Sequence, residues 1–292
     1  MKKVLVSLFV LALTIPAFAQ NAPDINSSNP NAKKFMMRGY AKPGGGGTSN
    51  LSYHTGGVVI RNANVVFIFW GSAFGSGGSD AGYAAELQAF RNQFGSTGEY
   101  RTVVQYYGED PVSGYGNIAT GSLVGQADWF DGTNPPQNVT DATVQSEVKK
   151  YVANFGVDYN AVYEVILPKT SFSSDGSSAS CGATSGYSLA YCAYHSHYTD
   201  ASGKNVKYSI EPYPSCSGCT VSGWTAAQNQ EHFVTHETRE AVTDALGNAW
   251  FDRRGYEADD KCAWTPTPFI GTGGYGYQYE WSNADNGCVQ TK

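Results

Sequence analysis

The chain has 292 residues, with 19 lysines and arginines against 25 aspartates and glutamates, and a formal net charge of −6. Charged residues make up only 15% of the chain, while glycine (34) and tyrosine (20) are abundant, which excludes a disordered polyelectrolyte and favours a compact, loop-rich domain. The sequence contains no basic run, so nucleic acids and anionic membranes are not expected partners.

The N-terminus has the pattern of a bacterial secretory signal peptide over residues 1–19. Lys2 and Lys3 precede an apolar run at 4–13, and Ala-Phe-Ala at 17–19 matches a cleavage site. The apolar run is too short to span a bilayer. Cleavage would leave 17 basic against 25 acidic side chains, a net charge of −8. We therefore expect a secreted protein, extracellular or periplasmic.

Composition and hydrophobic periodicity divide the rest of the chain into a linker and one domain. Residues 20–50 are rich in Asn, Pro, Gly and Ser and are predicted to be a disordered linker, and 51–292 to be a single domain. Strands are predicted at 58–60, 65–71, 101–107, 161–167, 187–198 and 206–213, helices at 79–94, 140–155 and 224–246, long loops at 109–138 and 170–186, and a hairpin at 275–281. This order predicts an α/β (α+β) fold, with helices packed on a single mixed sheet.

The six cysteines predict disulfides, because an even number in an exported protein is typical of a cross-linked scaffold. Proximity in sequence favours the pairs Cys181–Cys192, Cys216–Cys219 and Cys262–Cys288. Alternatives for the Cys-x-x-Cys segment at 216–219 are a redox motif or half of a zinc site, but Pro214 and Gly218 favour a turn, and no second Cys-x-x-Cys follows.

The strongest chemical signal lies in the predicted helix 224–246. His236 and Glu240 are four residues apart and share one face of a helix, so they could bind one cation. The spacing matches the His-Glu-x-x-His pattern of zinc peptidases, with glutamate in place of the second histidine. Glu237 would then act as the base on a metal-bound water. The alternative is a solvated helix face on which Arg239 balances nearby carboxylates.

The third ligand stays open at this point. Glu257 follows Glu240 by 17 residues, and His195 or His197 could join from a predicted strand. Asp260 could accept the free N–H of the liganding imidazole. A second imidazole would favour Zn²⁺, whereas one imidazole with carboxylates also suits Ca²⁺ or Mn²⁺.

Several segments resemble the phosphate-induced-protein, or EXORDIUM-like, family. They are LSYHTGGVV at 51–59, NVVFIFWG at 64–71, YCAYHS at 191–196, THETREAVTD at 235–244, NAWFD at 248–252 and EADDKC at 257–262. They occur in the family's order between Leu51 and Cys288, with one departure at Ala245, where the family usually has proline. In plants this family is associated with cell walls and growth. The resemblance implies an extracellular, zincin-like metalloprotein, and it places His195, His236, Glu237, Glu240, Glu257 and Asp260 at motif positions.

Together these observations predict a secreted metal-dependent hydrolase that acts on a peptide or protein, with Zn²⁺ as cofactor. The alternative is a non-catalytic extracellular or wall-associated binding protein, in which the same carboxylates hold Ca²⁺ or no metal. The sequence contains no Gly-x-Ser-x-Gly nucleophile segment and no phosphate-binding glycine loop, so serine-hydrolase and P-loop chemistry are not expected.

Overall fold

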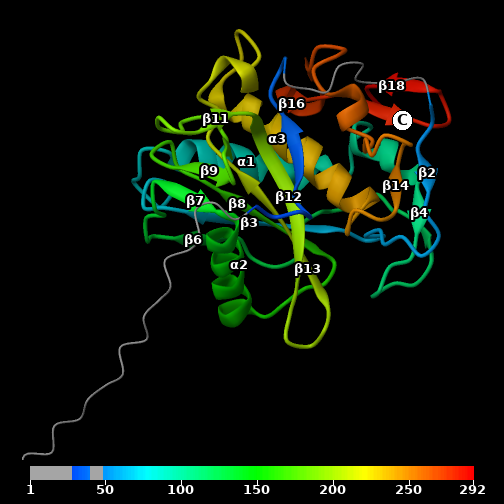
Figure 1. The fold of residues 1–292 in the computed structure, drawn as a ribbon, viewed down its shortest axis with the longest axis horizontal. Helices are drawn as coiled ribbons and strands as arrows, with labels where there is room; N and C mark the ends of the chain where they lie inside the picture. The colour runs from blue at the N-terminus through cyan, green and yellow to red at the C-terminus, as the bar shows by residue number, and fades with distance from the viewer. Residues whose placement is uncertain (1–27, 40–48) are drawn as a thin grey trace, which may run out of the picture.

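A six-stranded mixed sheet forms the centre of the protein (Figure 1). In a computed structural model that describes residues 28–39 and 49–292, its strand order is β1 (Lys33–Met36), β12 (Tyr191–Thr199), β13 (Asn205–Glu211), β8 (Ala161–Ile166), β3 (Asn64–Trp70) and β6 (Trp129–Asp131). β12 is antiparallel to both of its neighbours, and the other pairs are parallel. The predicted mixed α/β fold is confirmed, and the predicted signal peptide lies outside the described residues.

Three α-helices cover the two faces of this sheet. They are α1 (Ala81–Phe94), α2 (Asp141–Phe155) and α3 (Ala226–Thr243), close to the predicted ranges. Side chains of β3 alternate between the faces: Val65 and Phe67 belong to the cluster that contains α1 and α3 residues, and Val66 to the cluster that contains α2 residues. A strand buried on both faces explains why its sequence is a continuous apolar run.

Smaller elements surround this core. A second sheet has the order β11 (Ser188–Leu189), β10 (Ser178–Ala179), β9 (Phe172–Asp175) and β7 (Asn138–Thr140). Two-stranded pairs join β2 (Ser52–Tyr53) to β14 (Trp250–Phe251), β4 (Tyr107–Gly108) to β5 (Gly116–Asn117), β15 (Phe269–Ile270) to β16 (Gly276–Tyr277), and β17 (Glu280–Ser282) to β18 (Gly287–Val289). Short 3₁₀ helices span Tyr100–Gln105, Ser217–Cys219, Asp260–Cys262 and Thr272–Gly274.

The strand predicted at 101–107 is wrong, because Tyr100–Gln105 is a 3₁₀ helix. Its first turn is fixed by Thr97, whose hydroxyl accepts the backbone N–H of Tyr100. Tyr100 and Val103 are both fully buried, as expected for residues that eclipse each other three positions apart. Tertiary packing here outweighs the β propensity of the sequence. The strand expected at 58–60 is reduced to a single bridge between Val58 and Glu109.

The linker predicted for 20–50 contains a strand, so that prediction is wrong at Lys33–Met36. This segment is β1, which pairs antiparallel with β12 at the edge of the main sheet. Lys33 lies opposite His195, and Phe35 lies opposite Ala193. Because residues opposite each other in a β pair point to the same face, Lys33 and Phe35 point to the α3 side of the sheet. The polar composition of the flanking residues concealed this strand.

All six cysteines form disulfides, but two of the predicted pairings are wrong. The bonds are Cys181–Cys216, Cys192–Cys219 and Cys262–Cys288, with Cα–Cα distances of 5.4, 5.5 and 5.8 Å. Cys216 and Cys219 lie at either end of a tight turn, in which the Cys219 N–H donates to the Cys216 carbonyl. Each therefore reaches a different segment, and both are unavailable for a redox or zinc site.

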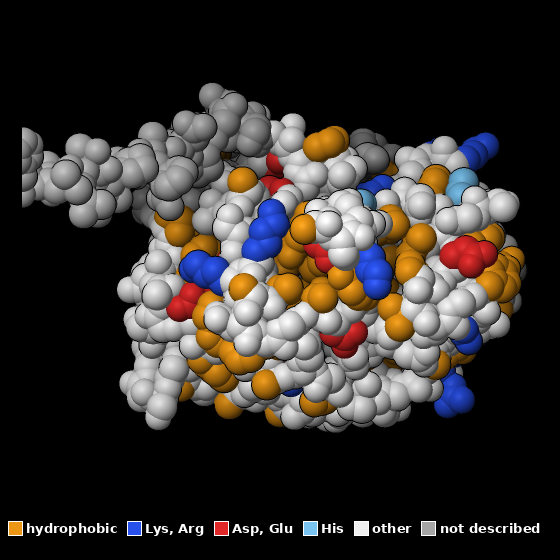
Figure 2. All heavy atoms as spheres, turned by 90° about the horizontal axis from the view of Figure 1, so that it is seen from below, with side chains coloured by type: hydrophobic (Ala, Val, Ile, Leu, Met, Phe, Trp, Pro, Cys, Tyr) orange, Lys and Arg blue, Asp and Glu red, His pale blue; other side chains and the backbone are white. Residues whose placement is uncertain are grey.

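None of the helices in the described part of the chain has the length and hydropathy that crossing a membrane requires. On the face drawn in Figure 2, lysine and arginine side chains are scattered among polar and hydrophobic ones and form no continuous basic patch.

Candidate metal centre

Helix α3 carries the centre of the candidate site. Its first turn is fixed by a capping box, in which the Thr225 hydroxyl accepts the Gln228 N–H and the Gln228 side chain accepts the Thr225 N–H. One helical turn apart, His236 Nε2 and Glu240 Oε2 are separated by 3.2 Å. Both side chains are buried, so the alternative of a solvated helix face is excluded.

Strand β12 brings His195 to the same point. Its Nδ1 lies 3.0 Å from Glu237 Oε2 and 3.9 Å from Glu240 Oε2, and its Nε2 lies 3.6 Å from Glu257 Oε1. His195 therefore contacts the helix residues directly, and ligand atoms of Glu257, His195 and Glu240 all lie within 4.8 Å of one another. His197 lies opposite Lys207 in the pairing with β13 and joins no group of metal-ligand type among the described residues.

The segment after β14 contributes two predicted residues in different ways. Glu257 reaches the site through its carboxylate, as described above. Asp260 donates its main-chain N–H to Glu240 Oε1 over 2.8 Å, so it fixes a candidate ligand through its backbone. The residue that faces Nδ1 of His236 is Gln278, whose Oε1 lies 3.2 Å away. Gln278 lies in a Gly- and Tyr-rich stretch that contains no recognisable motif, so the sequence offered no signal for it.

The ligand atoms fall into two overlapping groups that share Glu240. One group is His195, Glu240 and Glu257, and the other is His236, Glu237 and Glu240. In each group the possible ligand atoms all lie within 4.8 Å of one another. Each group contains one imidazole, and the shared Glu240 links the two groups, so together they offer two imidazoles and several carboxylates, which are donor types that zinc binds.

Several buried polar atoms of these residues have no hydrogen-bond partner in the part of the chain that the structure describes. Four such atoms belong to residues of the two ligand groups: His195 Nε2, His236 Nε2, Glu237 Oε1 and Glu257 Oε1 have no hydrogen-bond partner among the described residues. Leaving buried polar atoms unpaired is costly, and a cation bound between lone pairs removes that cost.

Burial also sets the protonation of the site in the absence of a cation. It raises the pKa of Glu240 to about 8, and, together with neighbouring carboxylates, it raises the pKa values of Glu237 and Glu257 well above their usual range. Burial lowers the pKa values of His195 and His236, so both imidazoles are neutral, the form that binds metals. Cation binding would therefore release protons from the carboxyl groups.

The site is closed to solvent on its β1 side. The side chain of Phe35 is fully buried, and its ring stacks on His236 with the centroids 4.1 Å apart. The exposed fraction of His195 is 2%, and those of Glu240 and Glu257 are 1% each. The structure therefore describes a site that is covered by the chain's own N-terminal strand.

A search of protein-family models, curated proteins and solved structures finds no match to this chain.

Proposed function

We propose that this protein is a secreted, zincin-like metal-dependent hydrolase that cleaves peptide bonds and belongs with the EXORDIUM-like proteins. The observation that carries the proposal is the convergence of two neutral imidazoles, His195 and His236, on the carboxylate of Glu240 in a buried site. The resemblance of the segments at 191–196, 235–244 and 257–262 supports it.

In this proposal His236 and Glu240 would hold a zinc ion, with His195 or Glu257 as the third ligand. A zinc ion held there would lower the pKa of a water molecule, so that hydroxide, which can attack a carbonyl carbon, becomes available near neutral pH. Glu237 would accept the proton of that water, because its Oε1 has no hydrogen-bond partner among the described residues while its Oε2 contacts His195. Asp260 would hold Glu240 in place through its backbone N–H.

The test combines metal analysis with peptide cleavage by the purified secreted protein. We expect one equivalent of zinc in the wild type, and loss of zinc in His236→Ala and Glu240→Gln. Glu237→Gln should retain zinc and lose cleavage by about 100-fold or more, as expected for the loss of a general base. Glu231→Gln is a matched control: Glu231 is a buried carboxyl of the same helix that accepts the Gly276 N–H and belongs to neither ligand group. Cleavage that survives Glu237→Gln would refute this assignment.

A second candidate is a non-catalytic extracellular protein in which the cation has a structural role. The complete burial of His236 and Glu237 favours it, since a catalytic site must admit substrate. In that case the metal would bind tightly and raise the melting temperature, yet no peptide library would be cleaved. Calcium in place of zinc in the purified protein would also favour this candidate.

A further inference from the structure

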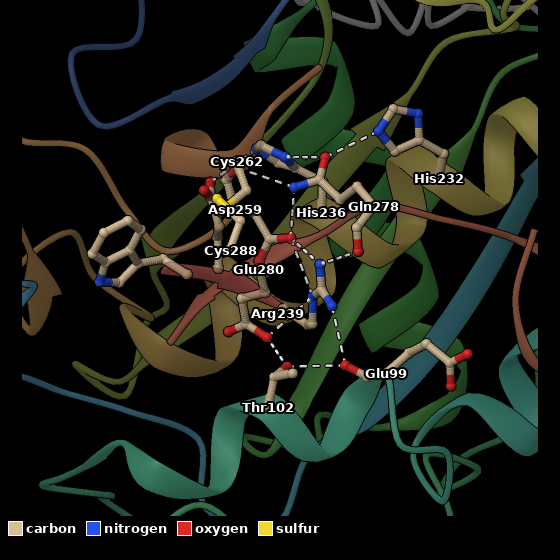
Figure 3. Close-up of polar contacts among 12 residues, drawn as sticks. Glu99, Thr102, His232, His236, Arg239, Asp259, Cys262, Gln278, Glu280 and Cys288 are labelled. Atoms are coloured by element: carbon tan, nitrogen blue, oxygen red, sulfur yellow. Dashed lines mark hydrogen bonds and ion pairs between the residues drawn. A yellow bond between two sulfur atoms is a disulfide. The ribbon is translucent and has the colours of Figure 1, made fainter. Parts of the chain in front are cut away.

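The side-chain amide of Gln278 lies between helix α3 and the segment that precedes the Asp260–Cys262 turn (Figure 3). Gln278 is fully buried. Its Nε2 lies 3.0 Å from the Asp259 carbonyl oxygen and 2.7 Å from Asp259 Oδ1. A backbone carbonyl oxygen can only accept a hydrogen bond, so the NH₂ group must face Asp259 and the amide oxygen must face the opposite way.

The amide oxygen of Gln278 faces two imidazoles. Oε1 lies 3.2 Å from His236 Nδ1 and 3.0 Å from His232 Nε2. Because an amide oxygen only accepts, each of these ring nitrogens must carry a hydrogen. In a neutral imidazole the proton of His236 is then on Nδ1, and Nε2 has a free lone pair. That Nε2 is the atom that lies 3.2 Å from Glu240 Oε2.

We infer that Gln278 is a positioning residue for the metal centre, which holds the proton of His236 on Nδ1 and so keeps Nε2 available as a ligand. The inference rests on the proposed metal site. It also gives His232 a role that its sequence position did not suggest, because its Nε2–H occupies the second lone pair of the same oxygen.

Arg239 fixes the orientation of Gln278 in turn. Its Nε donates to Asp259 Oδ1 over 3.1 Å, and its Nη2 forms an ion pair with the same oxygen. Nη2 also lies 3.3 Å from the main-chain carbonyl oxygen of Gln278. The arginine inside the His-Glu-x-x-Glu segment is therefore linked through Asp259 and Gln278 to the metal-facing imidazole (Figure 3).

The decisive measurement is the tautomer of His236 in the metal-free protein, read from ¹⁵N chemical shifts of histidine-labelled protein. The chain has only five histidines, so His236→Ala assigns the signal. We expect the Nδ1–H tautomer in the wild type. Gln278→Met is close in shape and lacks the amide oxygen, so it should shift His236 toward Nε2–H. Gln278→Glu, with its carboxyl protonated, keeps an oxygen facing the imidazoles and a donor facing Asp259, so it should retain the Nδ1–H form.

Zinc affinity supplies the second measurement, by competition with a chromophoric chelator. Gln278→Met should raise the dissociation constant about 10- to 100-fold, the usual effect of losing the partner of a liganding imidazole. Gln278→Glu should recover most of that loss. Gln230→Met is the matched control, because Gln230 is also buried on α3 but donates to Glu211, outside both ligand groups.

The results separate this inference from the proposed function. An Nε2–H tautomer in the wild-type protein would overturn the role of Gln278 whether or not the variants fold. A zinc affinity unchanged within threefold in a folded Gln278→Met protein would do the same. If the wild type shows the Nδ1–H tautomer but binds no zinc, the placement of the proton by Gln278 stands and the metal-dependent function fails.

Discussion

Helices α2 and α3 lie against opposite faces of the same sheet and are buried in different ways. Helix α2 buries one stripe of residues, Val144, Glu147, Val148 and Tyr151, and exposes the opposite side. Helix α3 is buried all around, and its buried residues include three carboxylates, two imidazoles and one guanidinium. Apolar area is sufficient to explain the position of α2. The position of α3 depends instead on partners for its buried ionisable and polar side chains, because leaving such groups unpaired in the core is costly.

The largest expected effect comes from breaking the charge pairing of α3. Arg239→Leu would leave the buried carboxylates of Asp259 and Glu280 without their cation, so we expect the free energy of unfolding to fall by about 3–5 kcal/mol. Urea denaturation of the wild-type and Arg239→Leu proteins measures this difference in the free energy of unfolding. A loss below about 1 kcal/mol would mean that α3 is held by packing alone, as α2 is.

Metal removal should have the next largest effect and should depend on pH. The folded-state pKa of Glu240 is about 8, above its unfolded value, so the stability that this group contributes is full at acidic pH and is lost as the pH rises toward 8. The metal-free protein should therefore melt at a lower temperature at pH 8 than at pH 5. Zinc at 100 times its dissociation constant should restore about 2.7 kcal/mol at pH 8. Equal melting temperatures with and without zinc would contradict a site at Glu240.

The smallest effect is expected on α2. Lys150 lies 2.8 Å from Glu147, but the lysine side chain is 52% exposed, so Lys150→Ala should cost less than about 1 kcal/mol. Burial raises the pKa of Glu147 to about 7, so at pH 6 this carboxyl is already mostly protonated and loses little ion pairing when Lys150 is replaced. Urea denaturation at pH 6 measures the loss in free energy of unfolding, which is then compared with the loss caused by Arg239→Leu. If Lys150→Ala lowered the free energy of unfolding as much as Arg239→Leu does, α2 and α3 would not differ in how far they depend on ion pairs.

Local sequence patterns were sufficient to predict the helices and strands that bury an apolar stripe or a continuous apolar run. Three elements were predicted close to their observed bounds: the strands Asn64–Trp70 and Ala161–Ile166 and the helix Asp141–Phe155. In each of them the spacing of apolar residues fits only one type of secondary structure. The 3₁₀ helix at Tyr100–Gln105 could not be predicted, because the burial of Tyr100 and Val103 in the core outweighs a β-type sequence. The cysteine partners likewise depend on how distant segments meet.

The same distinction applies to the candidate site. The relation between His236 and Glu240 follows from helix geometry alone and was predictable from their spacing. His195 and Glu257 were proposed as alternative third ligands, and both lie beside Glu240 only because β12 and the segment after β14 pack against the helix, which the sequence does not show. Gln278 could not be found in this way, since an amide that orients an imidazole has no characteristic spacing in sequence.

Strand β1 has a practical consequence for anyone who prepares this protein. A domain boundary chosen from the recognisable segments would begin expression at Leu51 and delete Phe35, the ring that stacks on His236, together with the strand that pairs with His195. Such a shortened protein would present an unpaired sheet edge at β12 and would expose the ring of His236 that Phe35 covers, and it would be prone to aggregate. Protein intended for assays should therefore start upstream of Asn29. The main-chain N–H of Asn29 donates to Asp175, and its side-chain amide donates to Asp141.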